Sequence, residues 1–190
     1  SSDLASGGYI GGGLYHSQNL EGALTTLPGA RIVCPSFADD AAGLLRTSMR
    51  SKGFTLYLEP KALYNSVEAA AVVPEEFEVP FGKARIRREG TDLTIITYGN
   101  TTHFCLDVAE RLAREGVGSV EVIDLRSLIP LDKEAIFASV RKTGKVMAVH
   151  EDKVFSGFGA EIAAQIAGEM FRYLDAPVQR VGSTFTPVGF

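Results

Sequence analysis

A run of three glycines followed by a histidine is the first place in this sequence where side chains could do chemistry. Residues 11–18 read Gly-Gly-Gly-Leu-Tyr-His-Ser-Gln, and the chain of 190 residues contains three histidines in all. Glycine lets the backbone approach a ligand closely, and an imidazole that titrates near neutrality can move a proton there. Because glycine runs are commonly turns and single histidines are commonly structural, this segment alone makes His16 no more than a candidate.

Further polar groups follow three predicted strands, at 98–100 (Tyr-Gly-Asn), 124–127 (Asp-Leu-Arg-Ser) and 150–152 (His-Glu-Asp). Parallel strands present their carboxyl ends at one edge of a sheet, so we expect these groups there. The cluster at 150–152 is either an acid–base or metal site or a solvated strand end with a helix cap, and the residue types leave both open. The helix start at 156–159 could hold an anion. A nucleotide fold with its own phosphate loop is disfavoured, since neither a Walker pattern nor a full Gly-x-Gly-x-x-Gly follows a strand.

The elements that must position these residues alternate between strand and helix. We expect strands at 31–34, 55–58, 92–98, 120–124, 145–150 and 178–181, and helices at 20–27, 37–50, 101–116, 132–140 and 159–171. Ser36, Thr101 or Thr102, and Asp132 are the expected helix N-caps. The alternation predicts an α/β fold with mainly parallel sheets flanked by helices.

Composition limits the classes of function. A chain that is 45% hydrophobic can form one large domain or two small ones, and its net charge of −4 offers no basic field for nucleic acid. Cys34 and Cys105 lie in apolar surroundings, so we expect reduced core thiols and no metal site with them. The sequence has no apolar run of membrane-spanning length and no signal pattern at its start. We therefore expect a cytoplasmic protein, or one of the mitochondrial matrix if the source is eukaryotic.

Five separated blocks of sequence resemble one known family. They lie at 12–18, 27–29 (Leu-Pro-Gly), 58–64 (Leu-Glu-Pro-Lys-Ala-Leu-Tyr), 90–94 (Gly-Thr-Asp-Leu-Thr) and 122–130 (Val-Ile-Asp-Leu-Arg-Ser-Leu-Ile-Pro). In this order they resemble the beta subunit, or fused beta half, of a thiamine-diphosphate-dependent branched-chain 2-oxo acid dehydrogenase. Shorter matches at 142–144, 150–151, 175–177 and 186–187 extend the resemblance to nearly the whole chain.

The resemblance implies oxidative decarboxylation of a 2-oxo acid and transfer of the acyl group to a lipoyl arm. Thiamine diphosphate and magnesium would be shared with an alpha subunit or alpha half, and the beta half would hold the pyrimidine ring. His16 matches the family histidine that lines the active-site channel and assists acyl transfer. The implied partners are the alpha half, a second beta subunit and a lipoyl-bearing transacylase.

Some positions depart from the family pattern. The family's activating glutamate comes upstream of the histidine motif and therefore upstream of Ser1, and the family chain continues beyond Phe190. We expect a fragment that is inactive alone and binds no cofactor by itself. Glu59 follows the histidine, so it is not that glutamate; we expect it to pair with Lys61 or Arg46.

Family members also bind a monovalent cation, usually potassium, after the helix that matches 37–50. Their aspartate and asparagine ligands correspond to Ser51 and Gly53 here. Backbone oxygens at Ser48 and Ser51 remain as ligands, and uncharged oxygens bind such an ion weakly.

We divide the chain into a partial pyrimidine-binding domain at 1–65, a connector at 66–90 and a transketolase-type C-terminal domain at 91–190, truncated at its end. Arg126, at a strand end, is expected to pair with an acid across the domain junction. Three alternatives stay open: a docking module without catalysis of its own, pyruvate dehydrogenase specificity, and an unrelated doubly wound domain that binds a nucleotide or flavin.

Overall fold

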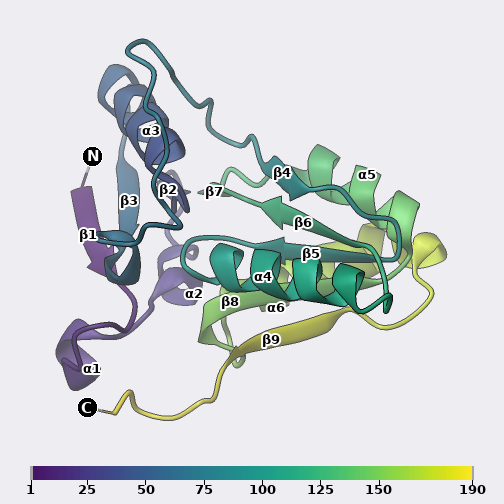
Figure 1. Cartoon of the computed structure of the whole chain (residues 1–190). Coiled ribbons are helices and arrows are strands. Elements are labelled where there is room, and N and C mark those ends of the chain that lie inside the picture. The colour runs from purple at the N-terminus through teal and green to yellow at the C-terminus, as the bar shows by residue number, and fades with distance from the viewer. Residues whose placement is uncertain (1, 190) are drawn as a thin grey trace.

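Two sheets form the framework of the molecule, as the computed structural model shows for residues 2–189 (Figure 1). The first sheet has the order β1-β3-β2-β7 and the second the order β4-β6-β5-β8-β9. The pairs β2–β7 and β4–β6 are antiparallel, and the remaining pairs are parallel. The predicted α/β fold with mainly parallel sheets is confirmed.

The strands of the first sheet are β1 (Ser2–Ser6), β2 (Arg31–Val33), β3 (Thr55–Pro60) and β7 (Ser127–Ile129). Those of the second are β4 (Arg85–Arg88), β5 (Leu93–Thr97), β6 (Val120–Asp124), β8 (Val146–Lys153) and β9 (Gln179–Ser183). The helices are α1 (Gly13–His16), α2 (Glu21–Leu24), α3 (Ala38–Arg50), α4 (Thr101–Arg114), α5 (Lys133–Thr143) and α6 (Phe158–Glu169). Two 3-10 turns, η1 (Lys61–Leu63) and η2 (Phe171–Tyr173), complete the elements.

Helices cover both faces of the second sheet, with α4 on one side and α5 and α6 on the other (Figure 1). The alternation of side chains along β5 explains this, because Ile95 packs on the α4 side and Ile96 on the opposite side. The latter core also contains Ile32 and Leu58 from the first sheet. One apolar core therefore holds the two sheets together.

All the predicted strands and helices are present, and the structure adds β1, β4, β7 and α1. The segment of β1, Ser-Asp-Leu-Ala-Ser, has one large apolar side chain, and β4 reads Arg-Ile-Arg-Arg, so neither carries a strong strand pattern. The three residues of β7 are too few for a pattern. Pairing with neighbouring strands, rather than local propensity, makes these segments strands.

The two sheets exchange segments of the chain. Strand β4 falls in the predicted connector at 66–90 and forms the edge of the second sheet, whereas β7, from the predicted second domain, completes the first. The division into 1–65, 66–90 and 91–190 stays a prediction.

Two of the expected helix caps are wrong. The hydroxyl of Ser36 lies 2.9 Å from both Thr102 Oγ1 and Asp124 Oδ1 instead of capping α3, whose N-cap residue is Phe37. Thr101 and Thr102 lie inside α4, which begins after Asn100 without a side-chain cap. The hydroxyls of Ser36 and Thr102 instead link the segment before α3 to α4 and the end of β6. The hydroxyl of Thr101 bonds to that of Thr97 and to the backbone oxygen of Tyr98.

Asp132, by contrast, caps α5 as predicted and accepts a hydrogen bond from Ala135 N at 3.2 Å. Cys34 and Cys105 are both buried and free, as expected for reduced core thiols. Within residues 2–189, no helix is long and apolar enough to cross a membrane.

Candidate functional site

The glycine run places His16 at the end of a single exposed helical turn. Gly11 and Gly13 have φ values of 63° and 57°, in the left-handed region that favours glycine. A side chain at Gly12 would collide with the Cβ atom of His16. Ser17 closes the turn, because its hydroxyl accepts a hydrogen bond from Gly12 N at 2.9 Å. The three glycines are thus required for the turn that presents the imidazole.

His16 lines a pocket of about 430 Å³ beside the carboxyl end of β1. Leucine side chains from β1, α2 and β3 form its apolar wall, namely Leu4, Leu24 and Leu58. Its polar groups include Gln18, Glu21 and Lys61, and the Lys61 ammonium donates a hydrogen bond to the backbone oxygen of His16. The pocket thus combines an accessible imidazole with an apolar wall.

Glu21 is a buried acid in the wall of the same pocket, and the sequence did not indicate it. Its side chain is 1% exposed, Asn19 Nδ2 donates to Oε1 at 2.8 Å, and Oε2 has no hydrogen-bond partner within the described residues. Burial raises the pKa of Glu21 to about 7; the Asn19 hydrogen bond opposes this, and the carboxylates of Asp152 and Glu151 add to it. In the sequence it is simply an acid in the first turn of a helix, so no signal distinguished it.

The cluster at 150–152 joins the second sheet to the N-terminal segment. Glu151 Oε1 accepts a hydrogen bond from Gly8 N at 2.8 Å, and Asp152 Oδ2 accepts one from Gly22 N at 3.0 Å. His150 is buried, and its Nδ1 lies 3.0 Å from the backbone oxygen of Asp152. Burial lowers the pKa of His150. The cluster is therefore neither a solvated strand end nor part of a metal site: among residues 2–189, no three His, Cys, Asp or Glu side chains are placed to share a metal ion.

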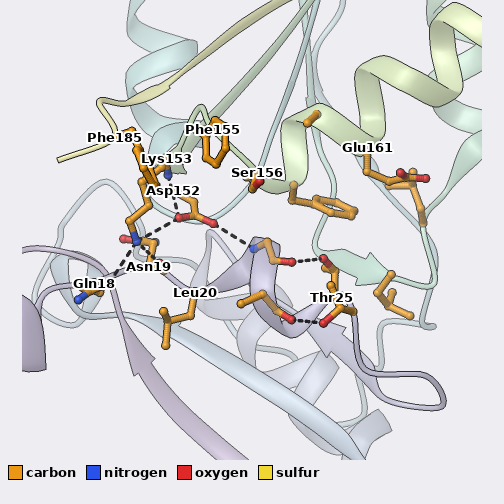
Figure 2. Close-up of a pocket in the computed structure, with 18 of the residues that line it drawn as sticks. Gln18, Asn19, Leu20, Thr25, Asp152, Lys153, Phe155, Ser156, Glu161 and Phe185 are labelled. Carbon is orange, nitrogen blue, oxygen red and sulfur yellow. Dashed lines mark hydrogen bonds and ion pairs between the residues drawn. The ribbon is translucent and has the colours of Figure 1, made fainter. Parts of the chain in front are cut away.

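A second pocket, of about 840 Å³, lies between α2 and the start of α6 (Figure 2). At this pocket Lys153 donates a hydrogen bond to the backbone oxygen of Asn19 at 2.8 Å. The rings of Phe155 and Phe185 pack with their centroids 4.6 Å apart at this pocket. The helix start at 156–159 thus contributes to a pocket between two parts of the chain.

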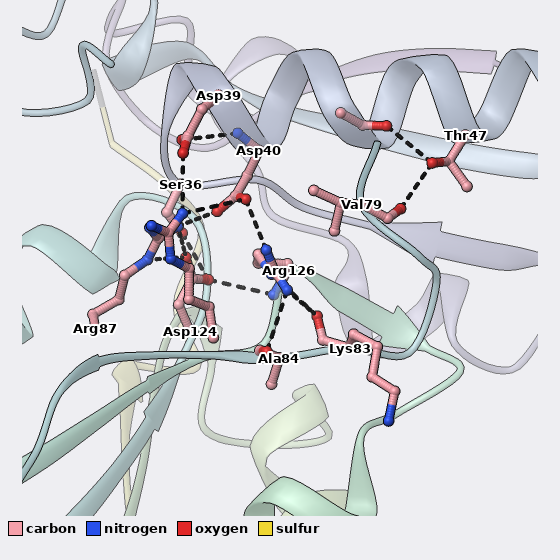
Figure 3. A network of polar contacts seen from close by, with 12 residues as sticks. Ser36, Asp39, Asp40, Thr47, Val79, Lys83, Ala84, Arg87, Asp124 and Arg126 are labelled. Carbon is pink, nitrogen blue, oxygen red and sulfur yellow. Dashed lines mark hydrogen bonds and ion pairs between the residues drawn. The ribbon is translucent and has the colours of Figure 1, made fainter. Parts of the chain in front are cut away.

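Arg126 pairs with an acid of the first sheet's helix, as the sequence predicted. Its Nη1 lies 2.7 Å from Asp40 Oδ1 in α3, and its other nitrogens donate to the backbone oxygens of Lys83 and Ala84 (Figure 3). Arg126 has a φ of 58°, a strained value for a non-glycine residue that these contacts hold in place.

Arg87 completes this network of buried charges. It lies 2.8 Å from Asp124 Oδ2 and also contacts Asp40. Burial raises the pKa of Asp124, and Arg87 counteracts the shift. None of these four residues lines the two pockets described above. Their geometry is that of a structural connection between the sheets.

The predicted partners of Glu59 are wrong. Glu59 Oε2 accepts a hydrogen bond from the Tyr64 hydroxyl at 2.6 Å, and burial together with this carboxylate raises the pKa of Tyr64 to about 12. Lys61 turns to His16 instead, and Arg46 donates to the backbone oxygens of Pro74 and Phe77. Lys61 is thereby part of the His16 pocket, whereas Glu59 is outside it.

The two serines predicted as cation ligands lie at the end of α3. Ser48 Oγ donates to Leu44 O at 2.7 Å, and Ser51 Oγ donates to Thr47 O at 2.6 Å. Both hydroxyls therefore serve the helix, and the cation site stays a prediction.

Comparison with known proteins finds one matching family and relatives that are named as beta subunits of 2-oxo acid dehydrogenases. Residues 82–190 match the family described as transketolase, C-terminal domain. The chain is 42% identical over 181 residues to the 2-oxoisovalerate dehydrogenase subunit beta of Bacillus subtilis (strain 168). The aligned region covers 95% of this chain and 55% of that protein. It is also 42% identical over 181 residues to a pyruvate dehydrogenase E1 component subunit beta of Staphylococcus epidermidis, covering 93% of this chain and 55% of that protein.

A solved structure described as a split gene transketolase, inactive beta4 tetramer, superimposes with a TM-score of 0.75. At 24% identity, covering 96% of this chain and 56% of that one, this likeness shows the fold alone. The chain spans about half the length of the curated relatives it matches.

Proposed function

This chain belongs to the transketolase C-terminal domain family, and from that premise we propose that it is part of the beta subunit of a thiamine-diphosphate-dependent 2-oxo acid dehydrogenase. Its relatives named as beta subunits support the proposal at 42% identity. The reaction would be oxidative decarboxylation of a branched-chain 2-oxo acid followed by acyl transfer to a lipoyl group. The equal identity to a pyruvate dehydrogenase subunit makes pyruvate the second candidate substrate.

The observation that carries the proposal is the exposed imidazole of His16 beside an apolar pocket of about 430 Å³. A lipoyl arm has to reach the acyl group from solvent, so a group that assists it must be accessible. An imidazole there can orient the dithiolane and exchange a proton with its sulfur. The leucine wall suits a short acyl chain or a planar ring.

The residues of this pocket fit one side of a thiamine site. When bound, thiamine diphosphate supplies the carbanion chemistry, and the protein supplies position, protons and electrostatics. Leu4, Leu24 and Leu58 would pack on the ring or acyl chain, with His16 and Gln18 at the rim. We assign the magnesium-bound diphosphate to the alpha half.

The proposal extends to partners and location. The alpha half, a second beta subunit and a lipoyl-bearing transacylase are the proposed partners, in the bacterial cytoplasm or the mitochondrial matrix. Potassium is proposed at the backbone oxygens of Ser48 and Ser51. Without its partners the chain is proposed to be inactive.

The test is a His16→Ala variant of the full-length beta subunit, assembled with its alpha subunit. Decarboxylation with an artificial electron acceptor should continue, whereas acylation of the lipoyl domain should fall by about 100-fold or more, the usual contribution of acid–base catalysis. His103→Gln is the matched control, since His103 packs against Phe37 outside this pocket. Unchanged acylation in the His16 variant would remove His16 from the mechanism.

Calorimetry separates the remaining classes. Thiamine diphosphate with magnesium should bind the assembled enzyme and not this chain alone. Tight binding by the chain alone would contradict a shared site, and binding of a flavin or nucleotide instead would favour the unrelated doubly wound class.

A further inference from the structure

Glu21 lies where the strand ends of the two sheets meet. A small cavity of about 10 Å³ at this place is lined by Ser6 from the end of β1, Cys34 after β2 and Tyr98 after β5. Glu21 lines both this cavity and the larger pocket that contains His16. Among the described residues that line the His16 pocket, Glu21 is the one acid, and it also borders the small cavity.

Two buried oxygens at this cavity have no hydrogen-bond partner within residues 2–189. They are Oε2 of Glu21 and the hydroxyl of Tyr98, whose side chains belong to residues that are 1% and 4% exposed. Buried polar atoms are nearly always paired, with protein or with an ordered water. A cavity of this volume is about the size of one water molecule, and both residues line it.

No basic side chain pairs with Glu21 among the described residues. Lys61, in the same pocket, donates to the backbone of His16, and Lys153 donates to the backbone of Asn19. The amide of Asn19 is the one side-chain donor to the carboxyl group among residues 2–189. Such a group holds its proton more strongly than an exposed glutamate, in agreement with its pKa of about 7.

We propose that Glu21 is the group through which the His16 pocket takes up and releases protons. The Glu21 O–H bond breaks, the proton passes through pocket water to the imidazole of His16, and the carboxylate keeps the hydrogen bond from Asn19. Bulk solvent returns the proton to the carboxylate through the open His16 pocket. Glu21 acts only through His16, as a donor and acceptor of protons. The inference therefore rests on the proposed function of His16.

Other titratable or charged groups face Glu21 and contribute to its equilibrium. They are Glu151 and Asp152 of β8, Tyr98 after β5, Cys34 after β2, and His16 and Lys61 at the pocket. Burial raises the pKa values of Tyr98 and Cys34 well above their usual range, so both stay neutral near pH 7. The carboxylates of β8 favour protonated Glu21.

The first measurement is infrared titration of the assembled full-length enzyme. A protonated-carboxyl band should be present in the wild type, absent in Glu21→Gln, and lost as the pH rises through about 7. Absence of any difference between the two spectra would overturn the proposal. This readout does not depend on turnover.

The second measurement is the pH profile of lipoyl acylation. A group with this pKa changes its protonated fraction about tenfold between about pH 6 and about pH 8, and Glu21→Gln should remove that limb. Glu59→Gln is the control, because that acid bonds to Tyr64 outside the pocket and should leave the limb intact. A limb that persists without Glu21 overturns the inference but leaves the proposed function standing, whereas unchanged acylation in His16→Ala overturns the function itself.

A second variant guards against a misfolded Glu21→Gln protein. Asn19→Leu removes the hydrogen bond that favours the carboxylate. The infrared midpoint and the acylation limb should both move to higher pH, and by the same amount. A limb that stays in place while the infrared midpoint moves would contradict the assigned role.

Discussion

Two polar clusters join the same two sheets, and they differ in how their buried atoms are paired. The paired cluster consists of Asp40, Arg87, Asp124 and Arg126, in which each carboxylate contacts a guanidinium (Figure 3). The unpaired cluster consists of Glu21, Tyr98 and His150, and each of these has one buried atom without a hydrogen-bond partner in the described part of the chain. Complete pairing is typical of a structural connection. An unpaired polar atom beside a cavity instead indicates a site where a ligand, a water molecule or a proton can bind.

The unpaired cluster is itself not uniform. His150 Nε2 lies against the backbone of Gly159, with no room for another group, and a neutral ring that donates from Nδ1 needs no proton there. Glu21 and Tyr98 instead border a cavity of about 10 Å³. The imidazole of His150 is therefore fully packed, whereas Glu21 and Tyr98 have space beside them for water.

The largest expected effect is loss of an arginine from the paired cluster. Arg126→Met leaves Asp40 buried with one of its partners removed, and should lower the free energy of unfolding by about 3–5 kcal/mol. Urea unfolding of the full-length chain measures it. Arg50→Met is the control, because the Arg50–Glu78 pair is largely exposed and should change stability by about 0.5 kcal/mol or less. Equal effects of the two variants would mean that the paired cluster is not structural.

The next effect is the pH dependence that Glu21 contributes to stability. Its pKa is raised from 4.5 to about 7 on folding, so the folded protein holds a proton that the unfolded chain has lost between these values. This contribution is fully present below about pH 4.5 and is lost as the pH rises through about 7, on the order of 3 kcal/mol in total. Glu21→Gln should flatten the stability profile across this window in urea unfolding. A profile with the same slope in both proteins would refute the raised pKa.

A smaller effect tests the packing around His150. A Cβ atom at Gly159 would lie 2.6 Å from His150 Cδ2, so Gly159→Ala should cost about 1–3 kcal/mol of stability through overpacking. Gly168→Ala, in the same helix, meets nothing within 4 Å and should stabilise by about 0.5–1 kcal/mol. Thermal unfolding of the two variants compares them directly. If Gly159→Ala leaves the stability unchanged, His150 Nε2 has room for a ligand.

The smallest effect concerns two tyrosine hydroxyls. Tyr57 donates to Ala41 O at 2.7 Å, and Tyr57→Phe should cost about 1 kcal/mol. Tyr98→Phe removes a hydroxyl that has no hydrogen-bond partner among residues 2–189, so its cost should be smaller. If Tyr98→Phe lowers the stability more than Tyr57→Phe does, the Tyr98 hydroxyl has a protein partner and does not face an open cavity.

The sequence predicted the strands and helices with strong local patterns, such as Leu93–Thr97 and Lys133–Thr143. It failed at Ser36, Thr101 and Thr102, because a hydroxyl that can cap a helix can also bond to other partners in the fold, and only packing decides between the two. At the site, the glycine-histidine segment made His16 a candidate, and its catalytic role stays a prediction. Glu21 had no signal, since burial rather than residue type makes it unusual.

Local sequence alone determined the alternation of strands and helices, the buried thiols and the glycine-rich backbone before His16, because hydrophobic period and glycine conformation are properties of short segments. Tertiary structure decided which acid meets Arg126, which atoms of Glu21 and Tyr98 lack partners, and that β7 completes the first sheet. These features join residues that are far apart in the chain, and burial changes the cost of charge only after the two sheets have packed.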